Sequence, residues 1–259
     1  MGADAPRDAD APRDADAPRG LSFSSSGLLL TYHLGVAQAL AQERWERVLG
    51  VSGGAVVALL LCVCPEKLEW CREHLRTREW AKGMTMADVW DPAARMLPAF
   101  LRSPGLLPPD AAERASGRLC VLCTRKRGRE VVRFEQWATT DELIATVQAS
   151  CSFAWSGVAL SDGHSYWDGG MGKGAKLLEV LPGLRTVTVA PVSGCGATIC
   201  PAHTGGPCIT TRYGHLSWRN VVRGWDVCFP RSAPVMDAHV AAGLADGRAW
   251  LQSDGRCYM

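Results

Sequence analysis

Short apolar runs and amphipathic stretches alternate along the N-terminal part of the chain. Leu21–Ser24 is strand-like, and from Leu28 to Arg44 apolar residues recur every three or four positions, which predicts a helix. Arg47–Val51 predicts a second strand, and Ala55–Cys62 is apolar enough for a buried helix. This succession of strand, turn and helix predicts an α/β fold with a parallel sheet.

The pattern is less regular farther along. Arg118–Thr124 and Glu130–Phe134 predict two strands around a basic turn, and Arg185–Val189 predicts another. Asp141–Ser150 predicts a helix with Thr140 as its cap. After Pro191 the chain is rich in Cys, Gly and Pro and gives little signal until Val235–Leu251, a predicted closing helix.

The N-terminus has a different composition. Residues 3 to 19 repeat the unit Ala-Asp-Ala-Pro-Arg-Asp, which has no apolar side chain larger than Ala or Pro to bury. We therefore expect residues 1–20 to be a disordered tail and residues 21–259 to form one domain.

Composition limits the classes of function. With 47% hydrophobic residues, 21% charged residues and a net charge of +2, the chain is typical of a globular protein and gives no argument for nucleic acid. The basic stretch from Arg125 to Arg129 is interpreted as a solvated hairpin turn, with a phosphate-binding patch as the alternative. The longest apolar run, Ala55–Cys64, is shorter than the ~20 residues of a membrane span, and no secretory signal opens the chain. We expect an intracellular, cytoplasmic protein that touches membranes from one side, with its eleven cysteines reduced.

Gly50-Val51-Ser52-Gly53-Gly54 fits G-x-S-x-G between a predicted strand and a predicted helix. A sharp turn there would project the Ser52 hydroxyl clear of the sheet, and the helix N-terminus would favour an oxyanion. The alternative is a structural Gly-rich turn. A second turn, Ser25-Ser26-Gly27-Leu28, could supply N–H groups to the oxyanion or could be an ordinary connection, with Gly27 best suited to a close approach.

The candidate base is harder to identify. None of the six histidines stands out: His33 in the first predicted helix favours a structural hydrogen bond, and His164 is a fallback base. Asp168 is followed by Gly169 and Gly170 and could expose its carboxylate on a tight loop, although Asp-Gly turns are common.

Cysteine and tryptophan give weaker patterns. Cys120 and Cys123 have C-x-x-C spacing, but in a strand they would face opposite sides and could not share a metal. A zinc ion could in principle be bound by Cys195, Cys200, His203 and Cys208. Free thiols in a loop are the favoured interpretation, so no metal or cofactor is expected. Packing is favoured over a membrane-interface role for most tryptophans near the predicted helices, namely Trp45, Trp70, Trp80, Trp90 and Trp137.

Several segments in order resemble the patatin-like phospholipase family, in particular the animal subfamily that contains adipose triglyceride lipase and adiponutrin. They span roughly Leu21 to Pro201 and comprise Leu21-Ser22-Phe23, Tyr32-His33-Leu34-Gly35-Val36, Gly50-Val51-Ser52-Gly53-Gly54, Ser150-Cys151-Ser152-Phe153, Ser156-Gly157, Tyr166-Trp167-Asp168-Gly169-Gly170, Thr186-Val187-Thr188-Val189-Ala190-Pro191 and Ile199-Cys200-Pro201. The resemblance implies a three-layer α/β/α sandwich with a mainly parallel central sheet.

The resemblance also implies a Ser–Asp dyad. Ser52 would be acylated, Asp168 would take its proton, and the loop around Gly27 would bind the oxyanion of a lipid ester. One departure is that Ser25 and Leu30 stand where relatives carry glycine, so a weakened enzyme is an alternative. The leading hypothesis is hydrolysis of acylglycerols or phospholipids at a membrane or lipid-droplet surface. The alternatives are a non-catalytic lipid-surface protein and a lipid acyltransferase.

Overall fold

A computed structural model of the 259-residue chain describes residues 18–77, 92–152, 157–202, 209–211, 214–229 and 231–256. The predicted N-terminal tail lies almost wholly outside these ranges, as do Trp80, Trp90, His203 and Cys208.

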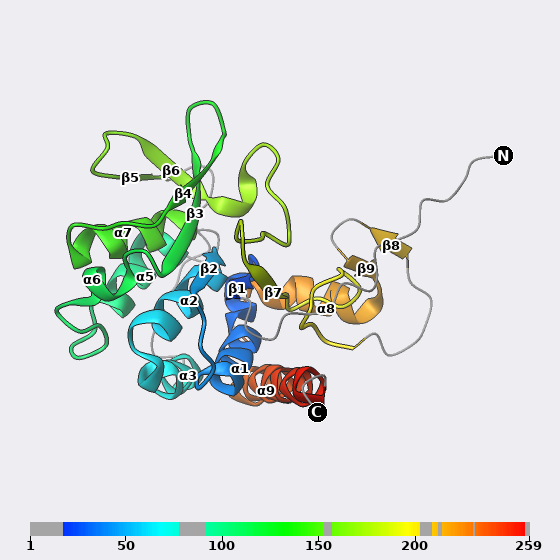
Figure 1. The fold of residues 1–259 in the computed structure, drawn as a ribbon. Coiled ribbons are helices and arrows are strands. Elements are labelled where there is room, and N and C mark those ends of the chain that lie inside the picture. Colours follow the sequence, from blue (N-terminus) through cyan, green and yellow to red (C-terminus); the bar gives the residue numbers. More distant parts are fainter. Residues whose placement is uncertain are drawn as a thin grey trace.

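Four adjacent parallel strands make up the larger part of a seven-stranded sheet (Figure 1). They are β7 (Arg185–Val189), β1 (Arg19–Phe23), β2 (Arg47–Val51) and β3 (Leu119–Arg125), adjacent in that order. Most of their residues are buried, as expected for parallel strands covered on both faces. The strands predicted at 47–51 and 185–189 are confirmed at both ends.

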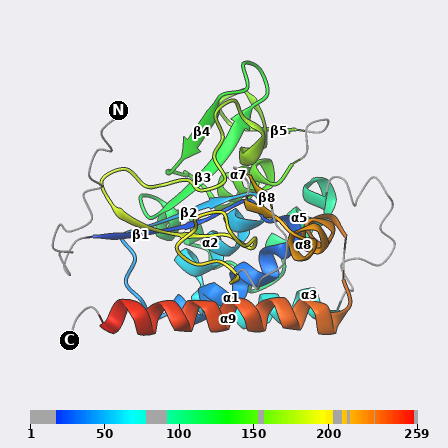
Figure 2. The same cartoon turned by 90° about the vertical axis from the view of Figure 1, so that its right-hand side faces the viewer.

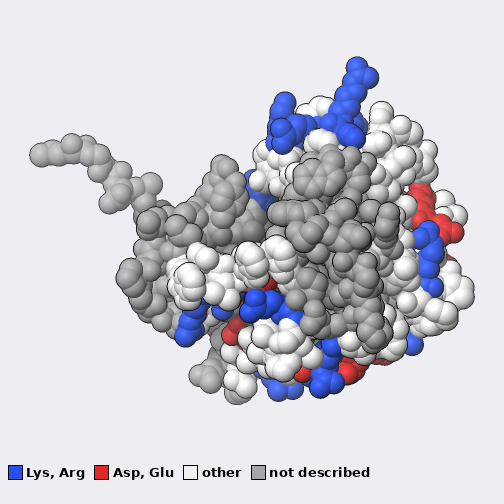
Figure 3. Space-filling view, turned by 180° about the vertical axis from the view of Figure 1, so that it is seen from behind, with Lys and Arg blue, Asp and Glu red and all other residues white. Residues whose placement is uncertain are grey.

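Three antiparallel strands extend the sheet beyond β3. They are β4 (Val131–Phe134), β5 (Val158–Ala159) and β6 (Ser165–Asp168). The basic stretch from Arg125 to Arg129 joins β3 to β4, which confirms the hairpin, and Lys and Arg side chains project there at the top of Figure 3.

β2 and β6 share one edge of β3, end to end. Val51 of β2 pairs with Leu122, and Asp168 of β6 pairs with the next residue, Cys123. Since β4 pairs with residues 121–124, it occupies the opposite edge. The two strands approach from opposite directions, so the end of β6 meets the end of β2.

Helices surround the sheet, and the predicted three-layer α/β/α architecture is confirmed (Figures 1 and 2). They are α1 (Leu30–Leu40), α2 (Gly53–Val63), α3 (Leu68–Thr77), α5 (Pro92–Leu101), α6 (Ala111–Ala115), α7 (Thr140–Ser150), α8 (Trp218–Cys228) and α9 (Ala233–Arg256), with short 3₁₀ turns η1 (Gly27–Leu29), η2 (Pro65–Lys67) and η4 (Gly169–Met171). The main core joins α1, α2 and α7 to one face of the sheet, and a smaller cluster lies under Leu181 on the other.

Helices α1 and α9 pack with almost no gap. A methyl group on Gly35 would lie 2.0 Å from the Val240 carbonyl oxygen, and one on Gly243 would lie 2.0 Å from that of Tyr32. The two glycines therefore let the backbones touch. Beside this contact the Tyr32 hydroxyl donates to Asp246 Oδ2 at 2.7 Å.

One prediction about secondary structure was wrong. Helix α7 is capped by Thr139, whose side chain accepts from the Glu142 N–H, so Thr140 is already inside the helix. The region after Pro191 holds α8 and a small hairpin of β8 (Ile209–Thr211) and β9 (Gly214–Leu216).

No helix in the described ranges combines the length and the apolar composition of a bilayer span.

Candidate active site

Ser52 lies in a strained turn between β2 and α2. Its φ of 57° and ψ of −132° are unusual for a residue with a side chain, and its side chain makes no cap for the helix. Crowding explains the adjacent glycines: a methyl group on Gly53 would lie 2.4 Å from the Gly27 oxygen, and one on Gly54 would lie 2.5 Å from the Ser24 oxygen. At Gly50 the same group would meet Ala55 Cα at 2.5 Å. The geometry is that of a nucleophile elbow.

Ser150, at the end of α7, holds this turn in place. Its fully buried hydroxyl accepts a hydrogen bond from the Ser52 N–H at 2.9 Å and donates one to the Leu122 carbonyl at 2.7 Å. The side chain thus links two backbone groups of neighbouring strands at the point where β2 ends. Sequence reasoning did not single out this role, because nothing local relates Ser150 to Ser52.

Asp168 is the last residue of β6, and the structure brings it to Ser52. The Ser52 side chain lies close enough to act on the pKa of its carboxyl group, and Oδ1 accepts a hydrogen bond from the Gly170 N–H at 2.8 Å. Its backbone is held by the Ser152 carbonyl and the Thr124 hydroxyl, each at 2.8 Å. The expectation of an exposed loop was wrong: the residue ends a strand and is 9% exposed, because β3 and α7 cover it.

Burial raises the pKa of Asp168 to about 6, although the hydrogen bonds from Ser52 and the Gly170 N–H act in the opposite direction. Desolvation disfavours the carboxylate more than these donors stabilise it. The side chain is therefore ionised at neutral pH but close enough to titration to exchange a proton, a property typical of a general base.

The Ser25–Leu28 turn lies against the elbow. Gly27 has a φ of +50°, and its nitrogen lies 3.1 Å from where a Gly53 methyl group would stand. The Ser26 Oγ lies 2.7 Å from the same point and is buried without a hydrogen-bond partner among the described residues. An unpaired donor in a buried position is costly unless something binds to it, which makes this group a candidate for ligand contact.

The side chain at Ser25 places no strain on this turn. In the described ranges the non-glycine residues with positive φ are Ser52 and Arg129, so the Ser25 backbone does not require glycine. The Ser25 Oγ lies beside Gly170, 2.7 Å from where a methyl group on that glycine would stand. Leu30 begins α1 and is not part of the turn itself.

The described histidines do not replace Asp168. The prediction of a structural hydrogen bond for His33 was wrong: the ring is fully buried beside Phe23, and neither nitrogen has a partner in the described chain. Burial lowers the pKa of His33 to about 3, so the ring is neutral. His164 lies exposed on the turn between β5 and β6, where its N–H bonds Asp162, so it does not serve as the fallback base.

The cysteine patterns form no metal cluster within the described residues. Cys120 belongs to the small core cluster and Cys123 to the main one, which confirms that they face opposite sides of the sheet. Cys195 and Cys200 are free thiols, and the other two zinc candidates lie outside the described residues. Of the tryptophans, Trp45 and Trp137 are buried, and Trp70 is 38% exposed and stacked on His74.

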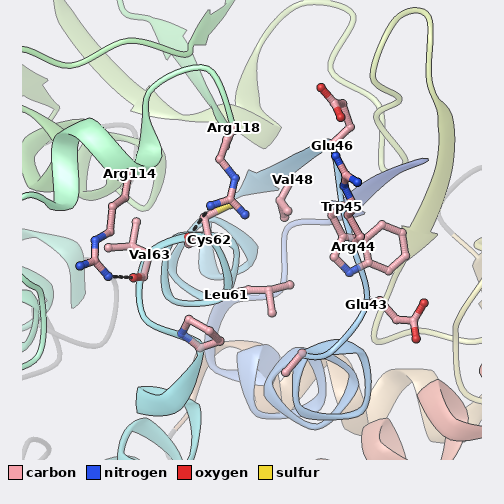
Figure 4. A pocket seen from close by; sticks show the side chains of 12 residues that line it. Glu43, Arg44, Trp45, Glu46, Val48, Leu61, Cys62, Val63, Arg114 and Arg118 are labelled. Atoms are coloured by element: carbon pink, nitrogen blue, oxygen red, sulfur yellow. Dashed lines mark hydrogen bonds between the residues drawn. The ribbon is translucent and has the colours of Figure 1, made fainter. Parts of the chain in front are cut away.

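A hollow of about 530 Å³ lies at the other end of α2 (Figure 4). Trp45 lines it, and Arg118 and Arg114 donate to the carbonyls of Cys62 and Val63, each at 3.4 Å. These bonds satisfy the C-terminal carbonyls of the helix. Since α2 is about 16 Å long at 1.5 Å per residue, the hollow is separate from Ser52 at the helix N-terminus.

Comparison with known proteins is consistent with this geometry. Residues 21–179 match the family model described as "Patatin-like phospholipase". Human "Patatin-like phospholipase domain-containing protein 4" is 32% identical over 244 residues, which cover 87% of this chain and 93% of that protein. Human "Patatin-like phospholipase domain-containing protein 2" is 27% identical over 91% of this chain but 48% of its own length. Mouse "Omega-hydroxyceramide transacylase" is 31% identical over 51% of this chain and 23% of its own.

Proposed function

Because the chain belongs to the patatin-like phospholipase family, we propose that it hydrolyses carboxylic esters of lipids with Ser52 as nucleophile and Asp168 as base. The observation that carries the proposal is the strand register that brings the end of β2 to the end of β6, so that Ser52 lies beside the buried Asp168 carboxyl and acts on its pKa. The family supports a lipase or hydrolase activity, and the geometry supports Ser52 and Asp168 as its residues.

In the first half of the reaction, the Ser52 oxygen attacks the ester carbonyl carbon and its proton passes to Asp168. The carbonyl oxygen becomes an oxyanion as the new C–O bond forms. When the tetrahedral intermediate collapses, the bond to the alcohol breaks and Asp168 returns the proton to the departing oxygen. The acyl group then remains as an ester of Ser52.

In the second half, water takes the place of the alcohol. Asp168 accepts a proton from water as its oxygen attacks the acyl carbon, and the collapse releases the carboxylic acid and restores the Ser52 hydroxyl with that proton. No electron acceptor or metal takes part in this balance. One carboxylate is enough, because in each half of the reaction it accepts one proton and then returns it: the Ser52 proton goes to the departing alcohol, and a proton of water goes to Ser52.

Two backbone segments of the chain would donate hydrogen bonds to the oxyanion. The Gly53 N–H follows the nucleophile at the N-terminus of α2, and the Gly27 N–H approaches from the facing turn of Ser25, Ser26, Gly27 and Leu28. The unpaired Ser26 hydroxyl is positioned to add a third donor. Each such donor contributes about 3 kcal/mol to transition-state stabilisation when water is excluded.

The proposed substrates are acylglycerols or phospholipids, which lie in membranes and lipid droplets. The protein would then act peripherally at such a surface inside the cell. Acyl transfer is a second candidate, favoured by the similarity to a relative named as a transacylase. In that reaction a lipid alcohol replaces water in the second half, and Asp168 takes its proton.

Turnover of a short-chain p-nitrophenyl ester by matched serine variants tests the proposal. Ser52→Ala should lose turnover and labelling by a fluorophosphonate, and Asp168→Asn should lose turnover because an amide cannot accept the proton. Ser22→Ala, which removes an equally buried hydroxyl from β1, should retain both. Undiminished turnover in Ser52→Ala would refute the assignment.

Labelled diacylglycerol separates hydrolysis from acyl transfer. Release of labelled fatty acid alone supports hydrolysis, whereas labelled triacylglycerol that depends on Ser52 supports transfer. A protein that binds lipid but neither labels nor turns over would be the non-catalytic alternative.

A further inference from the structure

Helix α8 presents an apolar face to solvent. Trp218, Val221, Val222 and Trp225 follow the i, i+3, i+4, i+7 spacing of one helix face and are 78%, 46%, 36% and 57% exposed. Phe229 extends this face, since its ring stacks on Trp225 with centroids 4.2 Å apart. These residues line an open groove of about 500 Å³. An apolar cluster of this kind on a protein surface marks an interaction site.

The other face of α8 is anchored beside the candidate active site. A methyl group on Gly27 would lie 2.5 Å from the Val227 carbonyl oxygen, so the helix touches the proposed oxyanion turn directly. Asn220 fixes the N-terminal end, because its side chain bonds both backbone groups of Ser193 in the loop after β7. In Figure 2, β1 and β2 run toward the side on which α8 lies. The apolar face therefore borders the end of the sheet that carries Ser52.

Positive charge flanks the apolar face. Between residues 218 and 231 the chain has Arg219, Arg223 and Arg231 and one acidic residue, Asp226. Asp226 is 3% exposed and pairs with Arg231 at 3.2 Å, so this pair is neutral, and the positive charge beside the apolar face comes from the exposed Arg219 and the half-buried Arg223. In the view of Figure 3, Lys and Arg side chains, with some Asp or Glu side chains among them, border uncharged surface on the left, where α8 lies.

We propose that α8 docks the protein onto a phospholipid surface that contains anionic headgroups. This docking role rests on the proposed function. It adds the element of the fold that would bring Ser52 to its lipid substrate. Tryptophan rings favour the boundary between headgroups and acyl chains, and arginines beside them attract anionic lipid. A protein partner would not require this pairing of indole rings with a cationic margin.

Co-flotation with vesicles tests the proposal with the full chain. The probes are phosphatidylcholine vesicles with and without phosphatidylserine, and the variants are Trp218→Ser with Trp225→Ser, and Val221→Ser alone. Val180→Ser is the matched control, since Val180 is 52% exposed and lies next to Leu181, which packs at Gly20 near the start of β1. Circular dichroism and thermal melting confirm that the variants fold.

We expect binding that strengthens with phosphatidylserine and weakens with salt. The double tryptophan variant should bind about a hundredfold more weakly, because each of the two large apolar side chains contributes about a power of ten to such an equilibrium. Val221→Ser should bind more weakly than Val180→Ser, which should match the wild type. Turnover of a soluble ester should be unchanged in all four proteins.

Binding that is equal in the wild type and the double variant would overturn the proposal. So would a concentration-dependent dimer that the same substitutions abolish, because the face would then cover a second copy of the chain. Vesicle binding does not require catalysis, so α8 variants can also be scored on a Ser52→Ala background. Failure of the hydrolase proposal and failure of the docking proposal are thereby separate results.

Discussion

Removal of the Ser150 hydroxyl should destabilise the protein far more than removal of a neighbouring buried hydroxyl. In Ser150→Ala the Ser52 N–H and the Leu122 carbonyl both lose their partner in a fully buried position. Each orphaned group costs about 1 to 3 kcal/mol, so the free energy of unfolding should fall by about 2 to 6 kcal/mol. The strained backbone of Ser52 should also relax, because the bond that helps to hold it is lost.

Ser152→Ala is the matched control. Ser152 is also fully buried, but its hydroxyl donates at 3.0 Å to the Gln148 carbonyl, which already accepts from the Cys151 N–H. No group is orphaned, so a loss of about 1 kcal/mol is expected. Chemical denaturation measures both variants, and ester turnover should fall in Ser150→Ala alone. Equal stability and equal turnover in the two variants would refute the bridging role of Ser150.

Three further outcomes are expected. Because burial raises the pKa of Asp168 to about 6, kcat/KM should fall as the pH drops through about 6. The same shift makes ionised Asp168 unfavourable in the folded state, so Asp168→Asn should gain on the order of 3 kcal/mol in stability above pH 6 and little below about pH 4. Ser26→Ala should lower kcat by about a hundredfold with the fold unchanged, as measured by steady-state kinetics, and an unchanged kcat would exclude the hydroxyl from the oxyanion site. Gly243→Ala should lower the melting temperature because its methyl group meets the Tyr32 oxygen at 2.0 Å, whereas Gly224→Ala, with open space in α8, should raise it through a helix propensity gain of about 1 kcal/mol.

The elbow could be predicted from sequence because its determinants are local. Arg47–Val51, the glycines around Ser52 and the apolar run after them occur within one stretch, and each constrains the next. The family resemblance pointed to Asp168. The burial of Asp168 could not be predicted from the sequence, because it depends on packing against β3 and α7, which precede Asp168 in the chain and are not adjacent to it.

Helix α8 was missed, and among the described residues its apolar face stays largely exposed and belongs to neither core cluster. The i, i+3, i+4, i+7 pattern from Trp218 to Trp225 and the Ser217 cap were readable in the sequence. They lie in a Cys-, Gly- and Pro-rich region, where a short helix with two arginines and a central glycine does not stand out. The role of Ser150 was missed for the opposite reason: it exists only through contacts between distant segments.

The end-to-end placement of β2 and β6 along β3 makes the lengths of these two strands interdependent. One extra residue at the end of either would enter the space that the other already fills. An insertion there would have to bulge outward or shift the register of a whole strand, which turns alternate side chains to the wrong face. The pairing of β2 and β6 with β3 thus sets the distance between Ser52 and Asp168. Loops elsewhere can lengthen without changing that distance.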